Sequence, residues 1–222
     1  MLKNGSLDLT EERKAFSKFE NSFVGFGKNP VLLVIDMQKE YADRTNPWYF
    51  DMAAPVAHNI RRVLEVARKK KLRVIYTYNG FKPDLSDAGL MKVKSLDIAN
   101  RRVCIEGTPG VQIIDEIKPR ESDIVINKKR FSAFFGTDLL IYLRGLGADS
   151  VILTGCVTSG CIRMTAYDAY QYDYRVVIPK ECVGDQTRGL NDQSLFIMNE
   201  VVADVLPMDT VIKRIEALSP RK

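Results

Sequence analysis

The sequence has only one histidine, and it has no hydrophobic run long enough to cross a membrane. A metal centre built on several histidines is therefore excluded, and a Ser-His-Asp relay is disfavoured. The longest clean apolar run covers residues 31–35, whereas a membrane span needs about 20 residues. The first residues also lack the apolar stretch of a signal peptide. We therefore expect a cytoplasmic protein that binds no membrane.

Cysteine is scarce too, and the net charge is small. The four cysteines, Cys104, Cys156, Cys161 and Cys182, show no C-x-x-C pairing and no ligand-like spacing to a histidine. We expect free thiols, most of them buried as small apolar groups. The formal net charge is +5. This charge slightly favours anionic ligands, but it is too small and too dispersed to predict a nucleic-acid partner.

The chain does contain a regular alternation of apolar and amphipathic segments. Its 222 residues, of which 45% are hydrophobic and 27% charged, are typical of one globular domain or at most two small ones. Short, continuously apolar segments predict strands at residues 31–35, 73–77, 124–127, 151–154, 175–178 and 205–206. Amphipathic segments predict helices at residues 53–71, 111–117, 137–146, 161–172, 194–202 and 209–218.

The order of these segments indicates the fold class. Continuously apolar strands that alternate with helices are typical of a parallel sheet covered on both faces. We therefore expect an α/β fold with a doubly wound, mostly parallel six-stranded sheet and helices on both faces. Residues 1–28 are polar and charged and are expected to form an N-terminal arm, with a short helix near residues 10–19. Residues 29–222 are expected to form a single domain.

Three chemically useful side chains follow strands of this predicted sheet. Asp36 follows the first strand, and Lys128 follows the apolar part of the third. Cys161 follows the fourth, where the glycine-rich stretch 155–161 turns into a helix. Sheets of this kind bind ligands at the carboxyl ends of their strands. An acid, a base and a thiol are therefore expected to meet at one edge of the sheet.

Each of these residues also has a purely structural interpretation. A free cysteine is most often packed in the core, an aspartate after a strand often caps a helix, and the run 128–130 of three cations is typical of a surface loop. In the catalytic interpretation, the helix dipole and free N–H groups favour a Cys161 thiolate and also bind an oxyanion. Lys128 would then stabilise both anions as a fixed cation.

Several longer stretches make the sequence resemble a known family. They lie at residues 25–27, 30–36, 131–137, 154–161, 165–169 and 181–185, and they include Ser-Ala-Phe-Phe-Gly-Thr and Thr-Ser-Gly-Cys. Over about residues 25–207 the chain resembles the isochorismatase-like cysteine hydrolases, and among them the N-carbamoylsarcosine amidase group. The resemblance implies the isochorismatase-like hydrolase fold and hydrolysis of a C–N bond in a small amide or carbamoyl compound. It also implies a homodimer or a homotetramer.

The resemblance implies a catalytic triad of Asp36, Lys128 and Cys161. Lys128 is preferred to Lys129 because the family lysine lies four residues before the serine of the Ser-Ala-Phe-Phe stretch. An oxyanion hole formed by the N–H groups of Val157 and Cys161 is also implied, with a cis peptide bond before Val157. Nicotinamidases of the family hold a metal with histidines, and the only histidine here falls on a predicted surface helix. We therefore expect no metal and no cofactor.

The expected substrate contacts leave the choice of amide open. The residues proposed for them are Tyr41, Trp48, Phe131, Thr158, Gln186 and Arg188. Related amidases carry an arginine directly after Gly-Asp to bind a substrate carboxylate, but this chain has Gln186 there, and Arg188 is the nearest cation. An N-carbamoylsarcosine-like substrate is the first expectation. Maleamate, a ureido acid, or a non-catalytic module that binds a small molecule are the alternatives.

Overall fold

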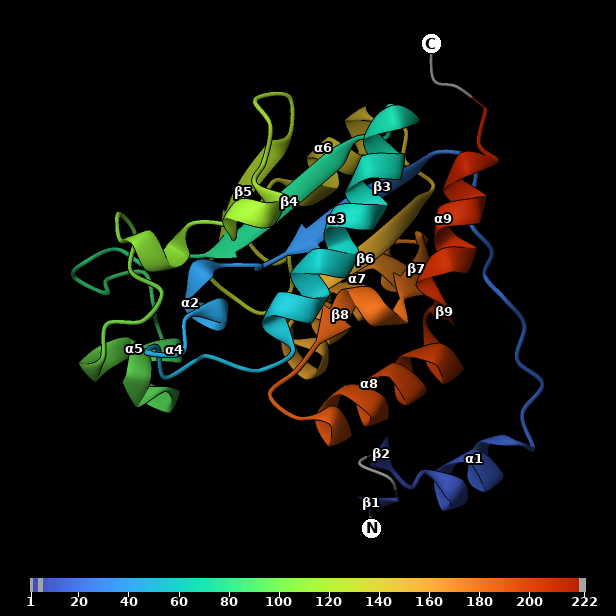
Figure 1. The fold of residues 1–222 in the computed structure, drawn as a ribbon, viewed down its shortest axis with the longest axis horizontal. Helices are drawn as coiled ribbons and strands as arrows, with labels where there is room; N and C mark the ends of the chain where they lie inside the picture. The colour runs from blue at the N-terminus through green and yellow to red at the C-terminus, as the bar shows by residue number, and fades with distance from the viewer. Residues whose placement is uncertain (1, 4–5, 220–222) are drawn as a thin grey trace.

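The structure, a computed structural model, describes residues 2–3 and 6–219 of the chain. Its main sheet has the strand order β5-β4-β3-β6-β7-β9, with β8 paired to β6, and these pairings are parallel (Figure 1). The strands are β3 (Pro30–Ile35), β4 (Val74–Asn79), β5 (Ile124–Lys128), β6 (Ser150–Cys156), β7 (Arg175–Pro179), β8 (Val183–Gly184) and β9 (Asp204–Leu206). The six predicted strands are all present. The two residues of β8 are too short a segment for an apolar pattern to reveal.

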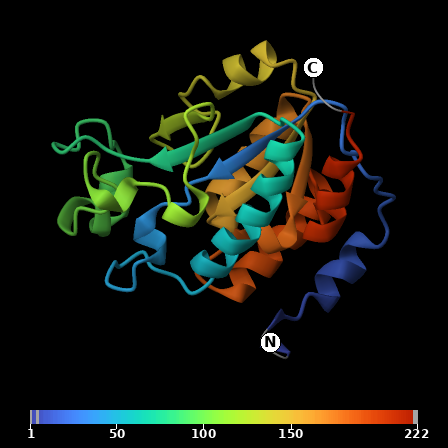
Figure 2. The ribbon, with the colours of Figure 1, turned by 45° about the horizontal axis from the view of Figure 1, so that its top comes forward.

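The sheet is covered by helices on both faces, as the continuously apolar strands predict. All six residues of β3 are buried. Leu32 and Val34 belong to one core with α3 (Ala53–Lys69) and α9 (Met208–Glu216). The alternate β3 residues lie in a second core, with α6 (Leu139–Gly145), α7 (Arg163–Gln171) and α8 (Arg188–Val201). Figure 2 shows α3 and α9 on one side of the sheet and α6 on the other.

The remaining elements are short. They are the pair β1 (Leu2–Lys3) and β2 (Ser6–Leu7), the helices α1 (Thr10–Phe16), α2 (Lys39–Ala42), α4 (Met91–Lys94) and α5 (Leu96–Asn100), the 3-10 turns η1 (Pro109–Val111), η2 (Asp115–Ile117) and η4 (Lys180–Cys182), and the π-helical turn η3 (Thr158–Ile162). The helix predicted at residues 111–117 is wrong, because Ile113 bridges to Gln38 between two 3-10 turns. The helix predicted from residue 194 begins at Arg188, because the Thr187 side chain caps it.

The N-terminal segment lies against the last third of the chain. The N–H groups of Val24 and Gly25 donate to the carboxylate of Asp204 at 3.0 and 2.9 Å, and the ring of Phe16 meets that of Phe196 edge to face. Residues 1, 4 and 5 of the expected arm and residues 220–222 of the expected domain lie outside the described residues.

Within the described part of the chain, every helix is too short or too polar to cross a bilayer.

The long connection between β4 and β5, residues 80–123, is called the excursion, and it forms a small core of its own beside the end of the sheet. Phe81, Ile98, Val103 and Ile105 are among its buried side chains. It carries α4 and α5, on the left of Figure 1. Glu40 of α2 fastens it, because both carboxylate oxygens lie 3.0 Å from the backbone nitrogen of Cys104. The excursion is therefore attached to the segment that directly follows β3.

Candidate active site

The strand order reverses at the centre of the sheet. From β3 the chain moves outward to β4 and β5, and it then returns to place β6 on the other side of β3. Such a switch point leaves a crevice at the carboxyl ends of the two central strands. Asp36 directly follows β3, and η3, which contains Cys161, begins two residues after β6. Lys128 is the last residue of β5.

The structure brings the three residues of the expected triad into direct contact. The Nζ atom of Lys128 lies 2.7 Å from Oδ2 of Asp36 and 3.2 Å from Sγ of Cys161. The same ammonium donates a third bond, of 2.8 Å, to the carbonyl oxygen of Arg130. Asp36 and Lys128 are fully buried, and Cys161 is 7% exposed. One cation therefore lies between a carboxylate and a thiol at the strand ends.

Local backbone geometry at β3 and β6 makes this approach possible. Gly155 has a φ of +117°, and a Cβ atom built on it would lie only 2.0 Å from the carbonyl oxygen of Ile35. Glycine is therefore required for β6 to pass this closely beside β3. Asp36 has a φ of +49°, a left-handed conformation that aspartate tolerates better than most residues. The peptide bond between Cys156 and Val157 is cis.

Known proteins similar to this chain identify its family. A family model described as the isochorismatase domain matches residues 30–210. The chain belongs to the isochorismatase family. The maleamate amidohydrolase of Pseudomonas putida is 31% identical over 196 residues, which are 88% of this chain and 91% of that protein. The N-carbamoylsarcosine amidase of an Arthrobacter species is 30% identical over 199 residues, which are 88% of this chain and 74% of that protein.

A solved structure shows the same fold. The crystal structure of a cysteine hydrolase from Pseudomonas syringae pv. phaseolicola superposes with a TM-score of 0.85 at 24% identity, covering 90% of this chain and 99% of that one. The mostly parallel sheet with its flanking helices is therefore the isochorismatase-like hydrolase fold. By its relatives, the chain is a member of a hydrolase family that acts on amide C–N bonds.

Electrostatics in this isochorismatase-family site differ from the expectation of a preformed thiolate. Burial raises the pKa of Cys161 to about 12, although the charge of Lys128 opposes the rise. Burial alone would lower the pKa of Lys128, but the charge of Asp36, together with the hydrogen bonds to Asp36 and Cys161, outweighs it and the pKa is raised. At neutral pH the site holds an ammonium ion beside a neutral thiol.

We expect the free energy of unfolding to fall steeply above pH 9. Burial raises the pKa of all four thiols above the ordinary value of 9.0, which the unfolded chain retains. Above that pH the unfolded state binds fewer protons than the folded state, so stability falls as the pH rises. Each thiol contributes a slope that approaches about 1.4 kcal/mol per pH unit. Urea unfolding between pH 8 and 10.5 measures the slope.

The variant Cys182→Ala isolates one of these thiols. Cys182 is fully buried in the core beneath α3 and α9, away from the contacts of Lys128. Its loss is expected to make the alkaline slope shallower by up to about 1.4 kcal/mol per pH unit. A slope identical to that of the wild type would contradict the assignment of raised thiol pKa values.

Two polar residues of β4 reach this site, and the sequence patterns did not single them out. The hydroxyl of Thr77 donates to Oδ1 of Asp36 at 2.7 Å, and both residues are fully buried. Asn79 lies opposite Lys128 in the pairing of β4 with β5, so their side chains share a face of the sheet. Its Oδ1 atom is buried and has no hydrogen-bond partner among the described residues. The available signal was a pair of polar residues, two positions apart, at the end of an apolar strand.

Removing the Thr77 hydroxyl is expected to weaken catalysis without unfolding the protein. In Thr77→Val the Asp36 carboxylate loses a hydrogen bond of a kind worth about 1.5–3 kcal/mol. We therefore expect kcat/KM for the amide substrate to fall roughly tenfold to 100-fold. Thr154→Val is the matched control, since the buried Thr154 hydroxyl donates to the carbonyl oxygen of Leu33 instead. Equal losses in the two variants would contradict a specific role for Thr77.

Two of the expected substrate contacts form an aromatic pair next to the triad. Tyr41 of α2 is buried, and its ring stacks on that of Trp48 at 6.1 Å between centroids. Burial, together with nearby groups that include Asp36 and Cys161, raises the pKa of Tyr41. The Trp48 Nε1 atom donates to Asp97 of the excursion at 3.0 Å. The pair therefore joins α2 to the excursion.

The other expected contacts are less favourably placed. Thr158 is fully buried, and its hydroxyl donates to Asn191 at 2.7 Å. Gln186 and Arg188 are exposed and line a separate hollow between α3 and the start of α8, in which none of the triad residues takes part. The Asp185 carboxylate accepts the Gln186 N–H at 2.8 Å. A contact of Gln186 or Arg188 with the substrate stays a prediction.

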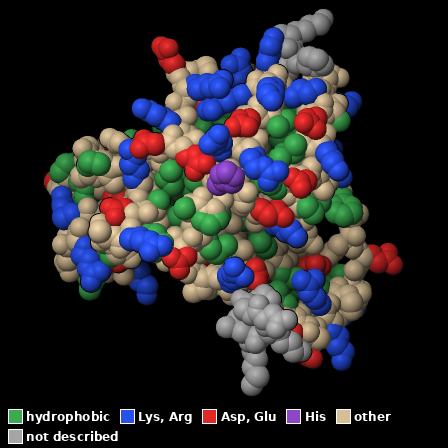
Figure 3. All heavy atoms as spheres, in the orientation of Figure 1, with side chains coloured by type: hydrophobic (Ala, Val, Ile, Leu, Met, Phe, Trp, Pro, Cys, Tyr) green, Lys and Arg blue, Asp and Glu red, His purple; other side chains and the backbone are tan. Residues whose placement is uncertain are grey.

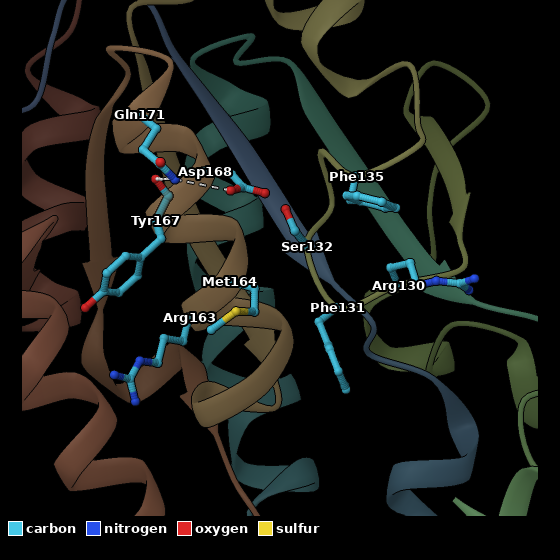
Figure 4. A pocket seen from close by; sticks show the side chains of 9 residues that line it. All are labelled: Arg130, Phe131, Ser132, Phe135, Arg163, Met164, Tyr167, Asp168 and Gln171. Carbon is cyan, nitrogen blue, oxygen red and sulfur yellow. Dashed lines mark hydrogen bonds between the residues drawn. The ribbon is translucent and has the colours of Figure 1, made fainter. Parts of the chain in front are cut away.

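Phe131 lies at a second hollow, which Figure 4 shows from close by. This hollow of about 510 Å³ is lined by the segment after β5 and by α7, through Arg130, Phe131, Ser132, Phe135, Arg163, Met164, Tyr167, Asp168 and Gln171. Phe131 is 48% exposed, and its ring lies near Gly160 of η3. The triad residues do not line this hollow, but Arg163 of its lining directly follows η3, and the carbonyl oxygen of Arg130 accepts a hydrogen bond from Lys128.

Residues that could bind a metal do not gather at this site. His58, purple in Figure 3, lies on the surface of α3, and its Nδ1 is 3.2 Å from Glu116. Within the described residues, no group of three or more His, Cys, Asp or Glu side chains is placed to hold a metal ion. The chemistry available at the strand ends is that of the carboxylate, the ammonium and the thiol.

Proposed function

We propose that this protein is a cysteine-dependent amidohydrolase that cleaves the C–N bond of a small linear amide or carbamoyl compound and releases ammonia. The observation that carries the proposal is the position of the Lys128 ammonium, 3.2 Å from the Cys161 sulfur and 2.7 Å from the Asp36 carboxylate. A thiol needs a nearby base to become a nucleophile, and a carboxylate in the same cluster supplies one. Similarity to relatives named as amidases supports this reaction class.

In the first half-reaction, a thioester forms on Cys161. The sulfur attacks the carbonyl carbon of the amide while Asp36 accepts the thiol proton, and the carbonyl π electrons move to oxygen. The backbone N–H groups of Val157 and Cys161 are proposed to bind this oxyanion. When the tetrahedral intermediate collapses, the C–N bond breaks and Asp36 passes its proton to the leaving nitrogen. Ammonia departs and the acyl group remains on sulfur.

The second half-reaction returns the enzyme to its starting state. Asp36 accepts a proton from water, whose oxygen attacks the thioester carbonyl carbon. The C–S bond breaks, the sulfur takes the proton back from Asp36, and the carboxylic or carbamic acid is released. Lys128 keeps its proton throughout, in line with its raised pKa. Its charge stabilises the carboxylate before the proton moves and the developing thiolate afterwards.

A neutral thiol in the free protein suits this scheme. With the pKa of Cys161 raised to about 12, few molecules hold a thiolate before substrate arrives. The proton therefore has to move during the attack, and Asp36 shares the Lys128 ammonium with the sulfur. General-base assistance of this kind contributes about 10²–10⁴-fold in rate.

We propose an N-carbamoylsarcosine-like substrate, with maleamate or a ureido acid as alternatives. Tyr41 and Trp48 stack as a pair from α2 toward the excursion, and Phe131 lies beside η3. These rings would hold a small, flat amide. Gln186 replaces the arginine of related amidases and is exposed, so a substrate carboxylate would need another partner.

An ammonia-release assay tests the proposal. Wild-type protein is incubated with N-carbamoylsarcosine, maleamate and 3-ureidopropionate, and Cys161→Ala is run in parallel. We expect ammonia from at least one amide with the wild type and none above background with the variant. Release from none of them would contradict the proposal, and binding without release would favour the non-catalytic module instead.

A further inference from the structure

The turn that carries Cys161 is held from outside by two side chains that the mechanism does not use. Oδ2 of Asp185 accepts a 2.6 Å hydrogen bond from the backbone N–H of Ser159. Oδ1 of Asn191 accepts a 2.7 Å bond from the hydroxyl of Thr158. Asp185 is 1% exposed and Asn191 is 5% exposed. Asp185 directly follows β8 and Asn191 lies in the first turn of α8, so side chains from this part of the chain bind two successive residues of η3.

We propose that Asp185 and Asn191 are positioning residues, which orient the turn so that the backbone N–H groups of Val157 and Cys161 face the substrate oxyanion. This inference rests on the proposed amidohydrolase function and assigns a role to two residues outside the triad. An oxyanion hole depends on donor direction, and removing one donor costs about 10²–10³-fold in kcat. If the turn changes its orientation, the N–H groups point less directly at the oxyanion and stabilise it less, even though every donor remains.

The Asp185 carboxylate is suited to positioning the turn because each of its oxygens accepts a backbone N–H group. Its second oxygen, Oδ1, accepts the N–H of Gln186 at 2.8 Å, so one carboxylate joins the turn to the chain after β8. Across the described residues, no lysine, arginine or histidine lies within ion-pair distance of Asp185. The backbone donors are therefore its main stabilising partners, and charge-assisted bonds of this type are short and strong.

The turn has an irregular hydrogen-bond pattern of its own. The N–H groups of Gly160 and Ile162 both donate to the carbonyl oxygen of Val157, at 3.1 and 3.2 Å. A π-helical turn of this kind is rare in proteins and is found frequently at functional sites. The pairing of β8 with β6, through Gly155 with Val183, places the strand that precedes Asp185 beside the strand that precedes η3. Asp185 and Asn191 therefore hold Thr158 and Ser159 against the same strand pair from which η3 begins.

Two reactions of the Cys161 sulfur separate a positioning role from a structural one. Iodoacetamide alkylates sulfur by displacement of iodide at a saturated carbon, which creates no oxyanion. With 4-nitrophenyl acetate, sulfur adds to a carbonyl carbon, the oxygen becomes an oxyanion, and collapse expels 4-nitrophenolate to leave an acetyl thioester. In Asp185→Asn only one oxygen remains as an acceptor for two N–H donors. We expect acetylation of Cys161 to slow by about tenfold to 100-fold, while alkylation changes less than about threefold.

A matched control exists elsewhere in the chain. Asp204 is also buried, at 4% exposure, and it also accepts two backbone N–H groups, from Val24 and Gly25. Asp204→Asn is expected to lower the melting temperature, yet to leave both reaction rates of Cys161 unchanged. Thr158→Val removes the donor to Asn191 with little change in volume, and we expect it to slow acetylation selectively by a smaller factor. This variant also serves if Asp185→Asn does not fold.

The outcomes are distinct. Equal slowing of acetylation and alkylation in both Asp185→Asn and Thr158→Val, or no slowing of either reaction, would overturn the positioning role. Peptide mass mapping assigns each adduct to Cys161. Because neither reagent is the natural substrate, failure of the ammonia-release assay would count against the proposed function and not against this inference.

Discussion

Replacement of Cys161 by alanine is expected to abolish amide hydrolysis, with a loss in kcat of about 10⁴-fold or more. The sulfur is the only atom of the cluster placed to form a covalent bond, since the ammonium of Lys128 is already bound on two other sides. The folded state should change little, because the side chain loses one sulfur atom at a site that is 7% exposed. Ammonia release per molecule of protein measures the loss, and thermal unfolding checks the fold.

The control for this prediction is Cys182→Ala. This residue is equally a buried free thiol, but it lies in the core beneath α3 and α9. The variant is expected to retain activity within about twofold of the wild type while losing some stability from the cavity it leaves. If Cys161→Ala kept a tenth of the wild-type rate, or if both variants lost activity alike, the nucleophile would have to be sought elsewhere.

Replacement of Lys128 by methionine is expected to cost both stability and activity. The side chain has nearly the same length, but the Asp36 carboxylate would be left fully buried without its cation. Breaking one side of a buried pair costs about 3–5 kcal/mol. Activity should fall at least about 10³-fold, because neither the carboxylate nor the thiolate would be stabilised during proton transfer. Urea unfolding and ammonia release measure the two effects separately.

A double variant separates the two effects of Lys128. Combining Asp36→Asn with Lys128→Met removes the buried carboxylate along with its cation, and most of the lost stability is expected to return. Activity is expected to stay absent, because the base is gone. Recovery of both properties, or of neither, would contradict the assignment of Asp36 and Lys128 as a buried ion pair with a catalytic task.

Lys129→Met tests the choice between neighbouring lysines. Lys129 is partly exposed and makes its ion pairs with Asp87 and Glu106 of the excursion. Exposed or partly exposed pairs of this kind contribute up to about 1 kcal/mol. We expect a small loss of stability and retention of most of the activity. A loss of activity as large as that of Lys128→Met would contradict the assignment.

The positions of Asp36, Lys128 and Cys161 were predictable because they depend on strand ends. Continuous apolar runs mark the strands, and in a parallel sheet their carboxyl ends meet at one edge. Burial of all six residues marks β3 as a central strand of the sheet. The edge at which an acid, a cation and a thiol meet therefore follows from local patterns, whereas the choice of Lys128 over Lys129 follows from the family resemblance.

The rest of the site depends on contacts between distant segments. Thr77 and Asn79 matter through the register of β4 with β3 and β5, which no local pattern displays. The raised pKa of Cys161 depends on how completely the site is buried, which the dipole argument from the sequence does not include. Gln186 was expected in the pocket from the family resemblance, because it directly follows Gly-Asp, and its exposed side chain lines the hollow between α3 and α8.

The most direct test of the account is the mass of the protein caught during turnover. The enzyme is mixed with an amide that it hydrolyses, quenched in acid at intervals from milliseconds to seconds, and mapped by peptide mass spectrometry. We expect an adduct equal to the substrate less ammonia on the peptide that contains Cys161, present during turnover and gone after substrate is exhausted. An adduct on any other residue, or full turnover with the Cys161 peptide unmodified at every quench time, would contradict the thioester mechanism.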